Sequence, residues 1–216
     1  MPTVASLSSS ARTVSRAAGP AHRVSPRVRT SPRPEAAPTG AQVTDATSSL
    51  SYQSLPAPWG GGCPATLDAP MFSWSAGESA VAGQVTMGGS TFDGKGDACS
   101  GQLQPQFPYS GPADLETTTM SLIGTLDPLY YNPLVHSRAV LESSALQASG
   151  HQGWVVKFLI SYSDAGAEGL SWTSELGGVV VADRGTGHAP AVFYVSVPAN
   201  LGASTVDALI GSLRLS

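Results

Sequence analysis

The sequence predicts an α+β fold in which helices cover an antiparallel β-sheet. Three observations predict it: a strand opens the folded part, antiparallel strands joined by short glycine-containing turns follow, and amphipathic helices occur in the middle and at the end. Residues 49–216 are expected to form one α+β domain, since their length suits a single core. Its sheet is expected to have about six or seven strands.

Residues 1–48 are predicted to be a disordered arm. They contain repeated Pro and Ser, no aromatic residue and no apolar period, so they cannot bury enough surface to offset chain entropy. Six arginines and one acidic residue give residues 1–40 a charge of +5, whereas five basic and fourteen acidic residues give 41–216 a charge of −9. An acidic domain argues against nucleic acid as a partner, because phosphate binding needs clustered Lys and Arg.

Three interpretations of this arm stay open. It is a plain disordered extension, a targeting segment such as an Arg- and Ser-rich transit peptide, or a mis-assigned start or fragment whose upstream membrane segment is missing. The chain as given has no apolar core of about 7 to 15 residues, which a secretory signal needs. It also lacks a run of about 18 apolar residues, so we expect no transmembrane segment in it.

The first strand is predicted at 50–55, where Leu50 and Tyr52 alternate with polar residues. Pro56 and Pro58 end this strand. Trp59 is then expected to cover the end of the core at the point where the strand leaves the sheet.

Residues 72–77 and 79–87 are predicted to form a hairpin that turns at Gly77-Glu78. Residues 88–101 are expected to be a glycine-rich loop, followed by a short strand at 100–104.

A helix is predicted after Gly111. Pro112 suits its first turn, Asp114 and Glu116 suit the positive end of its dipole, and Pro128 stops it. Its apolar face is formed by Leu115, Thr119, Leu122 and Leu126.

A second hairpin is predicted from residues 138–147 and 153–162, with its turn at Ser149-Gly150. One face of its second strand must belong to the core, since its members are all apolar or aromatic, whereas Lys157 and Ser161 mark the other face. The residues on that face are Trp154, Val156, Phe158, Ile160 and Tyr162.

Two more strands are predicted at 170–183 and 191–197, and a helix closes the chain. Ser204 and Asp207 have the spacing of a capping box at the start of this helix. Its apolar face is formed by Val206, Leu209, Ile210 and Leu213.

The segments LSYQSLPAPW, WVVKFLISYS, LSWTSELGGVVVADRGTGHAPAVFYVSVPAN and TVDALIGSLRLS resemble the opening and closing elements of the PsbP-like superfamily. Among its branches, the chain is most similar to actinobacterial envelope proteins of the LpqN-like type. The resemblance covers residues of about 49 to 216 and carries no catalytic motif. It implies a single α/β/α sandwich that acts as an accessory or binding subunit and not as an enzyme.

Cys63 and Cys99 are the only cysteines, and both are expected in glycine-rich loops beside strands. We favour a disulfide between them over two free or buried thiols, because few hydrophobic residues hold this segment. Closing such a loop stabilises the fold by roughly 4 kcal/mol in the chain-entropy model. The two cysteines have no nearby histidines, which argues against a structural zinc site.

No catalytic or nucleotide-binding motif occurs in the sequence, and we expect no cofactor and no metal. The DGKGD segment at 93–97 lacks the terminal glutamate of a calcium loop. His136 and His151 are expected at loop or strand ends. A deep pocket near either of them would favour the alternative of a hydrolase with dispersed catalytic residues.

Tyr130, Tyr131 and His136 are candidate contacts for a partner, although the two tyrosines have the alternative of packing at the helix exit. The expected function is a non-enzymatic accessory or binding domain. It is expected to be extracytoplasmic, at the cell envelope, and to bind a protein or an envelope component. A cytoplasmic location and a small-ligand module that uses the sheet face are the alternatives.

Overall fold

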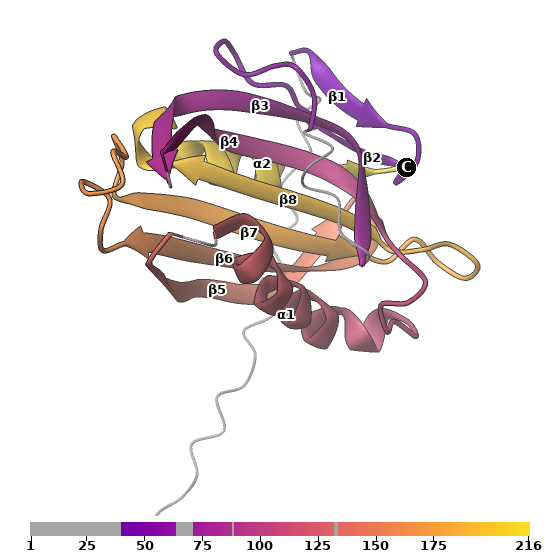
Figure 1. Ribbon diagram of the computed structural model, residues 1–216. Coiled ribbons are helices and arrows are strands. Elements are labelled where there is room, and N and C mark those ends of the chain that lie inside the picture. The colour runs from indigo at the N-terminus through magenta and orange to yellow at the C-terminus, as the bar shows by residue number, and fades with distance from the viewer. Residues whose placement is uncertain (1–39, 64–70, 88, 132–133) are drawn as a thin grey trace, which may run out of the picture.

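The computed structural model describes residues 40–63, 71–87, 89–131 and 134–216. Its centre is a six-stranded antiparallel sheet with the strand order β3-β4-β8-β7-β6-β5 (Figure 1). Helix α1 covers one face, and helix α2 with a small sheet of order β1-β2-β9 covers the other. The predicted α+β class, with helices on an antiparallel sheet, is therefore confirmed.

The strands are β1 (Gln42–Asp45), β2 (Leu50–Gln53), β3 (Phe72–Met87), β4 (Ser90–Leu103), β5 (His136–Ala148), β6 (His151–Tyr162), β7 (Ser174–Ala182), β8 (Ala191–Pro198) and β9 (Arg214–Leu215). The α-helices are α1 (Leu115–Leu126) and α2 (Ser204–Ser212). Short helical turns among the described residues are η2 (Pro112–Asp114), η3 (Asp127–Tyr131) and η4 (Ala199–Leu201).

The folded part begins earlier than the predicted boundary at residue 49. Strand β1 pairs antiparallel with β2, and Asp45 at its end is buried. The Asp45 carboxylate accepts hydrogen bonds from the backbone N–H of Thr47, from the Ser48 hydroxyl and from the Ser75 hydroxyl. The sequence does not predict that the domain begins with β1, because this strand is short and polar. Residues 1–39 of the predicted arm lie outside the described residues.

The predicted hairpin at Gly77-Glu78 and the predicted loop at 88–101 are both wrong. Residues 72–87 form one long strand, β3, which pairs with the equally continuous β4. Gly77 lies inside β3 at a position that has no room for a side chain. A Cβ there would come within 2.6 Å of the Ala98 carbonyl oxygen and 2.7 Å of the Cys63 Cβ. Gly94 has the same role in β4, where the Trp172 ring occupies the place of a side chain. These glycines permit close packing and do not mark turns.

The second hairpin and the middle helix are confirmed. β5 and β6 pair along their length except at Leu141, and Ser149 and Gly150 in their turn have φ values of 50° and 87°. Helix α1 ends at Leu126, and Pro128 lies in the π-helical turn η3 that follows.

Helix α2 is confirmed, but its capping box is wrong. Ala203 is the N-cap residue and no side chain caps the helix, because the chain enters from the turn at Gly202 already in helical conformation. The apolar face packs as predicted, since Val206 and Leu209 are fully buried. Each such side chain stabilises the fold by about 1.5–3 kcal/mol before entropy is subtracted.

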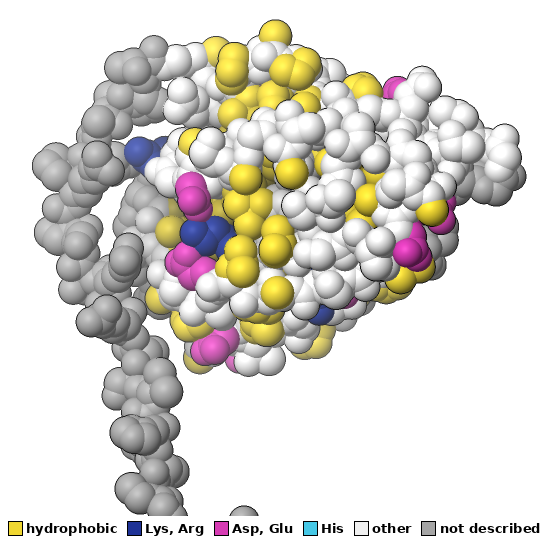
Figure 2. Space-filling model, turned by 90° about the vertical axis from the view of Figure 1, so that its left-hand side faces the viewer, with side chains coloured by type: hydrophobic (Ala, Val, Ile, Leu, Met, Phe, Trp, Pro, Cys, Tyr) yellow, Lys and Arg dark blue, Asp and Glu magenta, His cyan; other side chains and the backbone are white. Residues whose placement is uncertain are grey.

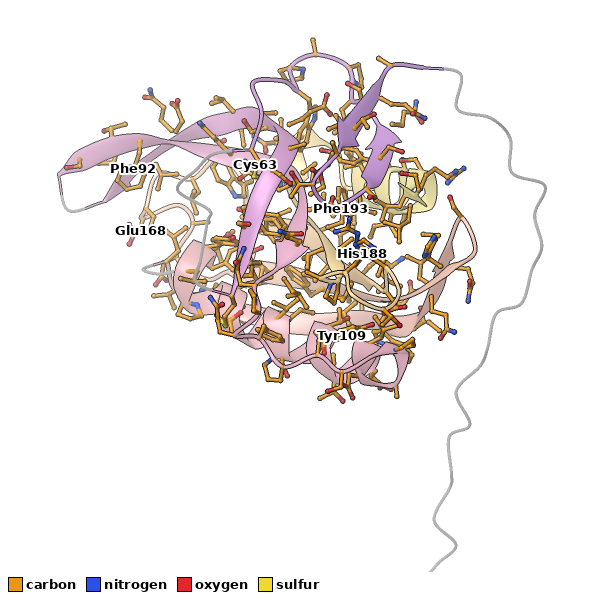
Figure 3. All side chains as sticks on the ribbon, turned by 90° about the vertical axis from the view of Figure 1, so that its right-hand side faces the viewer. Cys63, Phe92, Tyr109, Glu168, His188 and Phe193 are labelled. Atoms are coloured by element: carbon orange, nitrogen blue, oxygen red, sulfur yellow. A yellow bond between two sulfur atoms is a disulfide. The ribbon has the colours of Figure 1, made fainter. Side chains whose placement is uncertain are left out.

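Two cores lie on the two faces of the main sheet. The core under α1 includes Phe72, Leu103, Leu122, Ile123, Val156, Phe158, Ile160, Val179 and Tyr194. The core under α2 and the small sheet includes Leu50, Tyr52, Val180, Phe193, Val195, Val197, Val206 and Leu209. Phe193 points into this second core from the middle of β8 (Figure 3). The predicted core face of β6 is confirmed, because all its members belong to the first core or pack against it.

Within the described ranges, no helix has the length and apolar character that crossing a membrane requires.

The close approach at Gly77 yields a test of the corrected strand. Replacing Gly77 by Ala is expected to lower the free energy of unfolding by about 1–3 kcal/mol, because the new methyl group overlaps the Ala98 carbonyl and the Cys63 side chain. Urea unfolding of the oxidised protein measures this change. Gly166→Ala is the control, since no atom lies within 4 Å of the position that a methyl group would take there, and it should change stability by less than about 0.5 kcal/mol. Equal effects of the two substitutions would contradict the packing role of Gly77.

Candidate interaction surface

An apolar surface lies along α1, η3, the residue before β5 and the first half of β5. Seven large hydrophobic side chains are exposed among the described residues, and five of them lie in this region. They are Met120, Leu129, Val135, Val140 and Leu141, which we call the β5 surface. Hydrophobic side chains also collect in a band between polar ones on the face that Figure 2 displays. Such clustering marks an interaction site more than scattered exposure does.

A β-bulge in β5 lies at Leu141. Val140 pairs with Phe158 and Glu142 pairs with Lys157, so Leu141 has no partner on β6. Leu141 is 57% exposed. Bulges of this kind re-aim side chains at sheet edges and are often functional.

The charged side chains on β5 are held by ion pairs within the chain. Arg138 donates to Asp127 Oδ1 at 2.7 Å and to the carbonyl oxygen of Ile123 at 2.6 Å. Lys157 Nζ lies 2.6 Å from Glu142 Oε2 and 2.8 Å from Asp207 Oδ1. The pKa of Lys157 is raised by these two acids, Asp207 foremost. The β5 surface therefore presents apolar side chains beside charges that are already paired.

A buried polar cluster lies behind the start of β5. The Glu175 carboxylate is 7% exposed and accepts hydrogen bonds from Tyr162 Oη at 2.8 Å, Trp172 Nε1 at 3.0 Å and Ser196 Oγ at 2.7 Å. Tyr131 Oη donates to Ser196 Oγ at 3.1 Å. Burial raises the pKa of Glu175, and its three donors oppose that rise. This cluster is closed by its own hydrogen bonds, so it offers no open position to a substrate.

The three predicted contact residues differ in burial. Tyr131 is only 3% exposed, so its prediction as a partner contact is wrong, because its ring packs in the first core and its hydroxyl joins the buried cluster. Tyr130 is half-buried and its hydroxyl accepts from Trp74 Nε1 at 3.0 Å. His136 is half-buried between the rings of Tyr131 and Tyr162. That Tyr130 and His136 contact a partner remains a prediction.

In the described part of the chain, His136 and His151 do not form catalytic pairs, because the contacts of their Nδ1 atoms are to backbone carbonyl oxygens. His136 Nδ1 lies 2.8 Å from the carbonyl oxygen of Leu134, and His151 Nδ1 lies 3.2 Å from that of Asp183. Within residues 40–63, 71–87, 89–131 and 134–216, no group of three or more His, Cys, Asp or Glu is placed to hold a metal ion.

A pocket of about 250 Å³ lies between the exit of β2 and the start of α2. It is lined by residues that include Gln53, Leu55, Thr205 and Ala208, and none of its lining residues is charged or a histidine. Ligand pockets are usually larger, about 300–1,000 Å³. Neither His136 nor His151 lines it, so it gives no support to the hydrolase alternative.

The space between α1 and the sheet is filled by side chains. The space between α1 and the sheet, bounded by Phe72, Leu122 and Tyr194 among others, has a volume of about 0 Å³ for water. The alternative of a ligand module that uses the sheet face therefore has no room under α1.

Cys63 and Cys99 are joined in a disulfide, with their Cα atoms 5.5 Å apart. Cys99 pairs in register with Tyr194 of the first core, while Trp59 packs against the second core. Residues 59–63 therefore pass around the edge of the sheet at β3. The expectation that Trp59 covers the end of a core agrees with this packing.

Asp97 on β4 lies beside the buried cluster, and its Oδ1 is buried without a hydrogen-bond partner among the described residues. Burial raises its pKa to about 6, the charge of Lys95 opposes this, and Glu175 adds to it. A raised pKa means that the folded state binds the proton more tightly than the unfolded state, so Asp97 costs stability as the pH rises from about 4 through about 6.

Asp97→Asn is expected to raise the free energy of unfolding at pH 8 by about 1–3 kcal/mol more than at pH 4, because asparagine cannot ionise. Urea unfolding at the two pH values measures this difference. Asp93→Asn on the exposed part of the same strand is the matched control and should leave stability within about 0.5 kcal/mol of wild type at both. A pH-independent effect of Asp97→Asn would contradict the raised pKa.

No family model and no curated protein matches the sequence. Among solved structures, the chain is similar to cyanobacterial PsbP (CyanoP) from Synechocystis, with 9% sequence identity and a TM-score of 0.49. The match covers 86% of this chain and 100% of that chain. Similarity at this level carries no argument about family or function. The resemblance to the PsbP-like superfamily, with its LpqN-like and actinobacterial parts, stays a prediction.

Proposed function

We propose that this chain is a non-enzymatic accessory domain that binds a partner protein through the β5 surface. The observation that carries the proposal is that five of the seven exposed large hydrophobic side chains among the described residues lie on α1, on η3 and on or directly before β5. The ion pair between Asp127 and Arg138 joins η3 to β5. The fully buried centre of an interface is more apolar than the rest of a protein surface, and methionine is enriched there. The paired charges of Arg138 and Lys157 beside them suit the polar rim of such an interface.

The location that we propose is extracytoplasmic, at the cell envelope. The Cys63–Cys99 disulfide supports it, because such bonds persist mainly in oxidising compartments. The resemblance of the sequence to LpqN-like envelope proteins agrees with this location.

Site-specific photo-crosslinking in the native host tests the binding surface. A photoreactive phenylalanine analogue at Leu141 or Val135 is expected to give a covalent adduct with one and the same partner protein, identified by mass spectrometry. The analogue at Phe92, which is also exposed but lies near the end of the β3–β4 hairpin, is the control and should give no such adduct (Figure 3). Equal adducts at Leu141 and Phe92 would show that the β5 surface has no special role.

Thiol labelling of the natively isolated protein tests the location. We expect no labelling of Cys63 or Cys99 before reduction, full labelling afterwards, and an intact mass about 2 Da below that of the reduced chain. Two freely labelled thiols in the native protein would contradict the extracytoplasmic proposal and leave the β5 surface as a separate question.

A further inference from the structure

We propose that the second half of β5 pairs antiparallel with the same strand of a second copy, so that two six-stranded sheets join into one. The segment concerned is 143–147, which we call the free edge. It lies beyond the bulge at Leu141, so this inference concerns a different part of β5 from the β5 surface and does not depend on the proposed function.

Within the described residues, the free edge lacks three usual protections of an edge strand: charged side chains, proline and a covering segment. β5 is the last strand in the sheet order, and within the described residues the backbone hydrogen bonds of 143–147 belong to its ladder with β6. β5 contains no proline and no lysine. Its charged residues, Arg138 and Glu142, lie outside 143–147 and are held in ion pairs. Natural proteins usually block long edges of this kind with charges, prolines or a covering segment.

The opposite edge of the same sheet is occupied by the chain itself. Ser79 on β3 exchanges two backbone hydrogen bonds with Gly60, at 3.0 and 2.9 Å. Asn200 Nδ2 donates to the Ala82 carbonyl oxygen at 2.7 Å, and the Thr86 N–H donates to the Glu168 carbonyl oxygen at 3.4 Å. Because one edge is occupied and the other is open, pairing through β5 stops at two copies and does not propagate into a fibre.

The hairpin geometry defines which backbone groups are available. Ala148 and His151 flank the two-residue turn, and in such hairpins the flanking pair is hydrogen-bonded and every second residue points the other way. The N–H and C=O groups of Ser143, Ala145 and Gln147 therefore point away from β6. A two-fold axis at Ala145 pairs this residue with itself and Ser143 with Gln147, which gives about six hydrogen bonds.

The side chains favour this register and a second copy as the occupant. Residues 143–147 read SSALQ, with no charge, so two copies of a domain that carries −9 place no like charges opposite each other here. Centring the pair on Arg138 would place two guanidinium groups face to face, which is destabilising. The bulge at Leu141 separates the two halves of β5 and leaves 143–147 as a regular segment.

Sedimentation velocity of the full chain from about 1 to 100 µM tests the proposal. The wild type is expected to sediment as a dimer at the upper concentrations, and Ala145→Pro as a monomer. Proline removes the outward N–H of Ala145 but no bond to β6, so the far-UV circular dichroism should stay unchanged. Ala145→Val keeps the N–H and is the matched control that should still form the dimer.

A cysteine pair tests the register even if Ala145→Pro fails to fold. In a hydrogen-bonded antiparallel pair the Cα atoms are about 5.5 Å apart, within the range of about 4.4–6.8 Å that a disulfide needs. Ala145→Cys should therefore give a covalent dimer on mild oxidation. Ala139→Cys, exposed on the same strand, should not, because its two copies would lie about 40 Å apart.

Three results would overturn the proposal. They are a wild type that stays monomeric at every concentration, equal crosslinking of Ala145→Cys and Ala139→Cys, and a natively isolated complex in which a different protein protects the amides of Ser143, Ala145 and Gln147 from hydrogen exchange.

Discussion

The covering of both faces of the six-stranded sheet is the constraint on which the rest of this structure depends. All eight residues of β8 are buried, because the first core packs on one side of this strand and the second core on the other. A partner or ligand cannot reach the central strands without unpacking a helix, which would expose large apolar areas. The accessible parts of the sheet are therefore its edges, and function has to be sought there (Figure 1).

Among the described residues, other segments of the chain bond to the backbone at the β3 edge but not at the β5 edge. At β3, the segment that carries Trp59 and Cys63 passes from the second core to the first, and the disulfide to Cys99 fixes it across Gly77. At β5, no segment within the described residues crosses the outer side of the strand. The disulfide thus does more than close a loop, because it holds the covering of one edge in place while the other edge stays free.

Local patterns predicted the elements whose signals lie close together in the sequence. The hairpin at Ser149-Gly150 and the apolar face of α2 are of this kind, because alternation and helical spacing act over a few residues. The long β3 and β4 strands were missed, since Gly77 and Gly94 are explained by Cys63 and Trp172, which are distant in sequence. The bulge at Leu141 is equally hidden from the sequence, because only the pairing with β6 reveals it.

The buried cluster explains why the β5 surface is firmly positioned although it is exposed. Tyr131, at the end of η3, is tied through Ser196 to the Glu175 carboxylate, and Asp127, at its start, is tied to Arg138 of β5. Both ends of η3 are therefore anchored, and Leu129 between them is left facing solvent. The hydrogen bond from Tyr131 to Ser196 joins two neutral hydroxyls and contributes about 0.5–1.5 kcal/mol, whereas the bond from Arg138 to the Asp127 carboxylate contributes about 1.5–3 kcal/mol. Together they hold the turn although it leaves an apolar side chain exposed. The exposure of Leu129 is thus imposed by a buried polar network and is not a defect of packing.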